Sequence, residues 1–159
     1  METVKITFLN DVLFIKKNVI DYFESINQTA ETGGILIGYK LFERNEYVLS
    51  AYTKQQMDDN ARFCDFERNS SKHFEILKSM WKENECLMYF GDWHFHPVDY
   101  VSPSSTDLKT FKKLCKNSVT SSKYMIFIIV AKKQFRVFIY DKKNAKLLHD
   151  EKVEYVKEL

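Results

Sequence analysis

The sequence has few glycines and prolines and no long apolar run. Of its 159 residues, four are glycine and two are proline, which leaves little room for flexible linkers or low-complexity tracts. No apolar run approaches the roughly 18 to 20 residues that a membrane-spanning helix needs. The N-terminal stretch METVKITFLND lacks the basic start and the small-residue cleavage site of a signal peptide. We therefore expect a cytoplasmic chain that does not contact a membrane.

Cysteine is scarce as well. Cys64, Cys86 and Cys115 are an odd number of residues, and none of them forms a C-x-x-C pair. This pattern is typical of reduced thiols in the cytosol and not of a disulfide framework. Each of the three is expected to be a buried apolar thiol and not a nucleophile.

The chain has no excess of one charge. It carries 24 Lys and Arg residues against 22 Asp and Glu residues. This balance lacks the excess of positive charge that is typical of nucleic-acid-binding proteins. Apolar side chains are abundant instead, with 45% hydrophobic and 15% aromatic residues. This content can build one sizeable core, so we expect a single domain over residues 1–159.

The hydrophobic pattern changes repeatedly between strand and helix periods. Strands are expected at residues 4–9, 33–41, 46–54, 88–96, 123–131 and 134–141, and helices at 14–27, 71–85 and 107–117. Residues 146–156 fit a further strand or a short helix, and residues 55–71 have no clear period and indicate a loop. Strands and helices interleave without a strict βαβ repeat. The expected fold is α/β (α+β), a mixed β-sheet flanked by helices.

The predicted helices have definite apolar faces. The inward residues are expected to be Phe14, Val19, Ile20, Phe23 and Ile26 in the first helix, Phe74, Leu77, Met80 and Trp81 in the second, and Leu108, Phe111 and Leu114 or Cys115 in the third. Ser104 or Ser105 is well placed to cap the third helix.

Two of the four histidines lie one residue apart in the stretch GDWHFHPVDYVSPSSTD, residues 91–107. Alternate residues of a strand point to the same face, so His94 and His96 project together and Phe95 projects to the core. The connection that follows is long enough to bring Asp107, in the first turn of the next helix, back over the strand end. Two histidines and an aspartate meet the ligand count of a catalytic zinc site, in which the ion lowers the pKa of its water to about 7.

The stretch contains H-x-H-P, six residues, then S-x-x-D, and Glu31 lies upstream in ETGGILIG. This pattern resembles the JAMM signature of the JAB/MPN metalloprotease family, in its prokaryotic JAB branch, and the similarity extends over about residues 12–141. The resemblance implies Zn²⁺ as the cofactor and His94, His96 and Asp107 as its ligands. It also implies Glu31 as the general base and Ser104 as the donor to the oxyanion.

Plainer roles exist for three of these residues. Ser104 could be a helix N-cap alone, and Asp107 could be a first-turn acid that the helix dipole favours. Glu31 could be a surface glutamate before a strand. Trp93 is expected to pack in the core, and Asp92 could support the histidines. His73 and His149 have no evident partners in the sequence, so we expect them to be structural or exposed.

Catalytic members of this family hydrolyse the isopeptide or peptide bond after the C-terminal tail of ubiquitin or a ubiquitin-like protein. The short chain and the W-H-x-H-P run resemble the small peptidases of bacterial antiphage (CBASS) operons. The resemblance implies a protein substrate whose extended C-terminal tail is conjugated through an amide. Its expected partners are activating and conjugating enzymes and a nucleotidyltransferase-type protein from the same operon. Residues 118–123 are too few to hold the ubiquitin-gripping insertion of eukaryotic relatives, which argues against ubiquitin itself.

Other interpretations share these residues. Residues 55–69 could be a flap that binds the tail by strand addition, or a structural loop. A non-catalytic JAB/MPN interaction scaffold usually lacks one or more motif residues, and all five are present here. A zinc peptidase that processes a sulfur-carrier tail, or an amidase for a small molecule, would use the same metal, base and serine.

Overall fold

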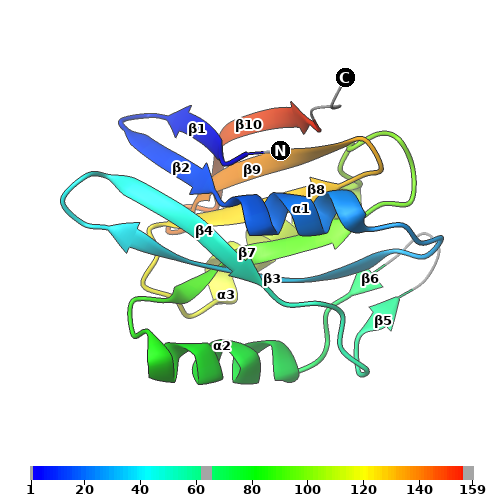
Figure 1. The fold of residues 1–159 in the computed structure, drawn as a ribbon, viewed down its shortest axis with the longest axis horizontal. Helices are drawn as coiled ribbons and strands as arrows, with labels where there is room; N and C mark the ends of the chain where they lie inside the picture. Colours follow the sequence, from blue (N-terminus) through cyan, green and yellow to red (C-terminus); the bar gives the residue numbers. More distant parts are fainter. Residues whose placement is uncertain (1, 62–65, 156–159) are drawn as a thin grey trace.

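The computed structural model describes residues 2–61 and 66–155, so Cys64 lies outside the described residues. Within them the chain forms one eight-stranded sheet, a two-stranded sheet and three helices (Figure 1). The strands of the large sheet are β1 (Val4–Phe8), β2 (Asp11–Ile15), β3 (Thr32–Leu41), β4 (Glu46–Tyr52), β7 (Met88–Phe95), β8 (Tyr124–Val130), β9 (Gln134–Asp141) and β10 (Lys146–Glu154). The small sheet pairs β5 (Asn60–Ala61) with β6 (Phe66–Glu67), and the helices are α1 (Lys17–Ser25), α2 (Lys72–Glu83) and α3 (Ser105–Asn117).

The large sheet is mixed, as the sequence predicts. Its strand order is β1-β2-β4-β3-β7-β8-β9-β10. Strands β2 and β4 run parallel, as do β7 and β8, and the other neighbours are antiparallel. Parallel neighbours need a crossover connection, and α3 supplies it between β7 and β8. The crossover begins α3 beside the carboxyl end of β7, where the histidine pair lies.

The sheet separates two apolar clusters. Helix α1 packs on one face through Val19, Ile20 and Phe23, in the same cluster as Trp93 and Phe95. The other face is covered by α3, with α2 beside it, and these helices lie away from α1 in Figure 1. Every residue of β8 is buried, as expected for a strand with helices on both faces. None of the helices that the structure describes has the length and apolarity needed to cross a bilayer.

The first predicted helix begins too early, because Phe14 belongs to strand β2. In β2 the alternate residues Leu13 and Ile15 are fully buried, and the strand pairs with β1 through a tight turn at Leu9, whose φ is +49°. The spacing of Phe14 to the later apolar residues coincides with a helical period. The strand period of β2 and its pairing with β1 prevail, and α1 starts at Lys17.

Helix α2 faces the sheet through only part of the side that its apolar spacing predicts, because Leu77 and Met80 pack against the core whereas Phe74 and Trp81 are exposed. Phe74 and Trp81 are 39% and 46% exposed, Leu77 and Met80 are half-buried, and His73 is fully buried. The expectation that His73 lacks partners is wrong, because its ring contacts Thr53 and Asp59. These polar contacts turn the His73 side of the helix inward.

Three smaller expectations also have an outcome. Residues 146–154 form a strand and not a helix, and its His149 has a partner in Glu151, 2.9 Å away. Cys86 is exposed and Cys115 is buried, so only Cys115 fits the expected buried thiol. Leu108 is 39% exposed on α3, whereas Phe111 and Cys115 point inward.

Candidate metal centre

The two histidines of the motif lie side by side at the end of β7. Phe95 between them is fully buried, so the pleat directs both imidazoles to the other face of the sheet. The Nε2 atoms of His94 and His96 are 2.8 Å apart. The alternation expected from the sequence therefore brings two ring nitrogens together.

Asp107 reaches the histidines from the first turn of α3. Its Oδ1 is 3.4 Å from His94 Nε2, and its Oδ2 is 3.6 Å from His96 Nε2. One ligand atom from each of the three residues lies within 4.8 Å of the others. A capping box holds the carboxylate there: Ser104 N–H donates to Asp107 Oδ2 at 2.8 Å, and Asp107 N–H donates to Ser104 Oγ at 3.0 Å.

Glu31 approaches from β3, on the other side of the histidines. The antiparallel register pairs Thr32 with Phe95 and Gly33 with His94. The residue before Thr32 is therefore brought next to His96, and Glu31 Oε1 lies 3.6 Å from His96 Nε2. Glu31 is 9% exposed, so it is not the surface glutamate of the plainer interpretation.

Ser104 is the N-cap of α3, which decides between the two serines that could cap the helix. In that bond Oγ is the acceptor, whereas a bond to an oxyanion would use the O–H as a donor. A hydroxyl has capacity for both. The capping role and the proposed catalytic role of Ser104 are thus compatible.

The charge states favour metal binding. Burial, and after it the neighbouring His94, lower the pKa of His96 to about 4, against the opposing effect of Asp107. His96 is therefore neutral at pH 7 and offers a lone pair. Burial alone would raise the pKa of Asp107, but bonds from His94 and the Ser104 N–H lower it to about 2. An ionised carboxylate and a neutral imidazole are the ligand forms that a metal needs.

The donor set fits a small divalent ion. Two atoms that bind one ion at about 2.0–2.1 Å in tetrahedral geometry lie roughly 3.3 Å apart. The three observed separations, 2.8, 3.4 and 3.6 Å, bracket that spacing. Two imidazoles and one carboxylate are a donor set that zinc accepts, with a fourth position left open.

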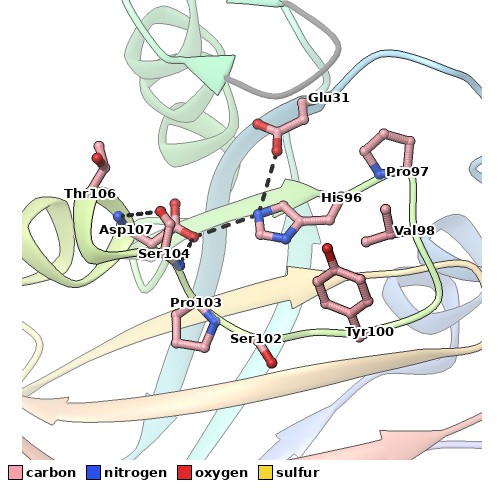
Figure 2. A pocket seen from close by; sticks show the side chains of 10 residues that line it. All are labelled: Glu31, His96, Pro97, Val98, Tyr100, Ser102, Pro103, Ser104, Thr106 and Asp107. Carbon is pink, nitrogen blue, oxygen red and sulfur yellow. Dashed lines mark hydrogen bonds and ion pairs between the residues drawn. The ribbon is translucent and has the colours of Figure 1, made fainter.

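Two cavities flank the centre and share Thr106 and Asp107. The first, of about 640 Å³, is lined by Glu31, His96 and the 97–104 loop (Figure 2). The second, of about 490 Å³, lies between β6, the end of β7 and one side of α3 that includes Thr110 and Leu114. Figure 2 shows the carboxylates of Glu31 and Asp107 both directed at Nε2 of the His96 ring, from different directions.

Asp92, which the sequence offered only as a possible support for the histidines, contacts other residues. Its carboxylate accepts a bond from Arg68 Nε at 2.5 Å and a further bond from the Tyr89 hydroxyl. Arg68 and Tyr100 line the two cavities, and the sequence does not single out either of them. No local sequence pattern marks these two residues. Each lies in or near a long connection, and the course of that connection in the folded chain places the residue at its cavity. Trp93 is buried and packs in the core, as expected.

The sequence is similar to a known protein family and to individual named proteins. Residues 24–141 match the family described as prokaryotic homologs of the JAB domain. A protein of Escherichia coli (strain TW11681) named CD-NTase/cGAS isopeptidase is 26% identical over 141 residues, which cover 84% of this chain and 86% of the relative. A protein of the same name from Vibrio cholerae serotype O1 is 25% identical over 118 residues, or 74% and 72% of the two chains.

A solved structure shares the fold. The solution structure of protein DSY2949 from Desulfitobacterium hafniense superposes with a TM-score of 0.56 at 16% identity. The match covers 89% of this chain and 90% of the other.

The first prediction concerns the metal. We expect the purified protein to bind about one zinc ion per chain, and His94→Ala or Asp107→Ala to weaken binding at least about 100-fold because each removes one of three ligands. Calorimetric titration with zinc and elemental analysis would measure both values. His149→Ala is the matched control, since this histidine lies on the edge strand β10. Undiminished zinc affinity in both ligand variants would disprove the assignment.

Proposed function

Because the chain belongs to the family of prokaryotic homologs of the JAB domain, we propose that it is a zinc-dependent isopeptidase, with residues 1–159 acting as one metallopeptidase domain. The observation that carries the proposal is the convergence of His94, His96 and Asp107 within 4.8 Å, next to the carboxylate of Glu31. These four residues come from the position before β3, from the end of β7 and the residue after it, and from α3, and they meet only in the folded chain.

His94, His96 and Asp107 are the proposed zinc ligands. When bound there, zinc would act as a Lewis acid on the substrate carbonyl and make water a better nucleophile at neutral pH. The chain itself supplies a neutral His96 and an ionised Asp107, both already oriented. Little rearrangement is then needed on metal binding.

Glu31 is the proposed general base. It immediately precedes β3, and its carboxylate faces the first cavity beside His96. From there it can accept a proton from the attacking water and deliver it to the leaving amine. Peptide amines are poor leaving groups unless they are protonated, so the second transfer matters as much as the first.

Ser104 is the proposed oxyanion donor. The capping box holds its Oγ at the N-terminus of α3, where the helix dipole also favours negative charge. A preoriented donor at this position would stabilise the charge that develops on the carbonyl oxygen.

The two cavities define a path for the substrate. We assign the conjugated tail to the cavity beside β6, where Phe66 to Asn69 form one wall and α3 forms the other. An extended tail could add to the short β5–β6 sheet there by strand addition. The leaving amine then occupies the other cavity, beside the exposed ring of Tyr100.

The substrate class follows from the relatives. Two of them are named CD-NTase/cGAS isopeptidase, and we infer that this chain likewise releases a CD-NTase-type protein conjugated through its C-terminus. The activity would reverse conjugation by activating and conjugating enzymes of the same antiphage operon. Processing of a sulfur-carrier tail would use the same residues, but the relatives favour deconjugation. The scaffold interpretation is disfavoured, because all five motif residues come together at one centre.

Glu31→Gln tests the base. The variant keeps the shape of the side chain but cannot accept a proton, so we expect kcat on a purified CD-NTase conjugate to fall at least about 100-fold. Zinc content should be unchanged, because Glu31 is not a proposed ligand. Glu43→Gln, an exposed glutamate, is the control. If Glu31→Gln cleaves the conjugate as fast as the wild type, Glu31 is not the base.

The same variant can identify the substrate in cells. Mass spectrometry would compare covalent conjugates in cells that express the wild type or Glu31→Gln together with the operon. Conjugates that accumulate only with the variant should carry the C-terminus of a CD-NTase in amide linkage. Accumulation of an unprocessed sulfur carrier instead would establish the alternative function.

Two substitutions separate the roles of Ser104. Ser104→Ala removes the cap and the hydroxyl, so it should lower the free energy of unfolding by about 1 kcal/mol and kcat by about 10²-fold to 10³-fold. Ser104→Asp can still cap the helix but has no proton to donate, so it should retain most of the stability and lose the activity. Chemical denaturation and steady-state kinetics measure both properties. If the Ser104→Asp enzyme is active, the Ser104 hydroxyl is not needed for catalysis and Ser104 acts only as the helix cap.

A further inference from the structure

A hydroxyl, an imidazole and a carboxylate outside the set of proposed zinc ligands contact one another in sequence, and two of them belong to the β4–α2 connection, described over residues 53–61 and 66–71. Thr53 Oγ1 is 2.5 Å from His73 Nδ1, and His73 Nε2 is 2.6 Å from Asp59 Oδ2. The order of groups is that of a nucleophilic triad. However, the side chains of His73 and Asp59 are fully buried and Thr53 is 2% exposed, so no substrate can reach the hydroxyl.

The Asp59 carboxylate accepts hydrogen bonds from both ends of the connection. Asp59 Oδ2 accepts the N–H of Gln56 at 2.8 Å, and Oδ1 accepts the N–H groups of Asn69 and Ser70, each at 2.8 Å. Burial alone would raise the pKa of Asp59, but these N–H groups and His73 lower it below its usual value. An ionised carboxylate with four donors holds the start and the end of the connection in one place.

The hydroxyl joins the connection to the two strands of the metal centre. Thr53 Oγ1 accepts the N–H of Ile35 in β3 at 2.9 Å, and the Thr53 carbonyl accepts the indole N–H of Trp93 in β7 at 3.0 Å. Because Thr53 Oγ1 accepts from Ile35, it can donate its proton to His73 Nδ1, and His73 Nε2–H can then donate to Asp59. Glu31 precedes β3 and His94 follows Trp93, so the chain of bonds ends beside the centre.

The ends of the connection also contact residues next to the centre. Thr32, which follows Glu31, donates through Oγ1 to Gln55 Oε1 at 2.8 Å. At the other end Arg68 pairs with Asp92 at 2.5 Å, and its guanidinium lies 5.1 Å from the centroid of the Phe74 ring. The wall of the cavity beside β6 is therefore linked both to the proposed base and to the histidine strand.

This wall has little regular secondary structure, and the ring of its Phe66 packs against Gly33 of β3. Strands β5 and β6 are two residues long, and Met57 is 90% exposed. Beyond this packing, polar bonds of Arg68, Asn69 and Ser70 fix its position. Buried polar networks are strict in geometry because each unpaired group in them is costly.

We propose that Thr53, His73 and Asp59 are positioning residues that hold the β4–α2 connection against β3 and β7, so that a bound substrate tail lies in register with Glu31. This role rests on the proposed function, because it concerns how the substrate is placed. A part that only stabilises the fold would affect the global unfolding of the protein and not the binding of the tail.

The test uses the zinc-loaded full chain and a neighbouring control. Asp59→Asn keeps the size of the side chain but turns one acceptor oxygen into a donor, which opposes the N–H groups around it. Asp58→Asn makes the same change at the next residue, which is exposed. Thr53→Val removes the hydroxyl, and Thr53→Ser retains it.

For Asp59→Asn and Thr53→Val we expect amide hydrogen exchange at residues 54–57 and 67–70 to become at least about 10-fold faster, while β8 stays protected. On a CD-NTase conjugate, KM should rise about 10-fold with kcat changed less than about 3-fold and zinc content unchanged. Asp58→Asn and Thr53→Ser should match the wild type in each measurement. If Asp59→Asn does not fold, the Thr53 pair decides.

The inference is overturned if Asp59→Asn and Thr53→Val keep the exchange rates and the KM of their controls, or lose only global stability. A wild type that cleaves no conjugate would refute the proposed function instead. The exchange rates would then show by themselves whether the three residues hold the connection.

Discussion

The pairing of β3 with β7 is the constraint on which the metal centre depends. Thr32 lies opposite Phe95 and Gly33 opposite His94, and this register alone brings Glu31 to His96. A slip of one residue would turn every side chain of β3 to the other face. Glycine is needed at position 33 of this pairing, because a Cβ there would lie 2.5 Å from the Trp93 carbonyl oxygen.

The start of α3 serves the fold and the site with the same atoms. Ser104 and Asp107 satisfy each other's backbone N–H groups in a capping box, which a helix needs at its N-terminus in any case. The same bonds orient the Asp107 carboxylate toward His94 and His96. The crossover from β7 to β8 brings this helix end to the strand end, so the topology of the parallel pair supplies the third proposed ligand.

Much of the fold could be predicted because its signals are local. Alternation marks β1, a continuous apolar run marks β8, and the S-x-x-D spacing marks the cap of α3 and the aspartate together. Phe14 was placed in a helix because its apolar spacing fits a helix as well as a strand, and pairing with β1 decides the outcome. The partners of His73, and the Arg68 partner of Asp92, are not evident from the sequence because they lie 14 to 24 residues away in the chain, within a connection that has no period.

The sequence by itself determined the composition of the candidate metal centre: two imidazoles on one strand face, an acid one helical turn after a capping serine, and a glutamate before a glycine-rich strand. These features follow from neighbours within a few residues, where backbone periodicity is sufficient. Only the tertiary structure decided which way α2 turns, which carboxylates are buried and how the walls of the two cavities are placed. Those depend on hydrogen bonds between segments far apart in the chain, and such bonds form only once the sheet has brought the segments together.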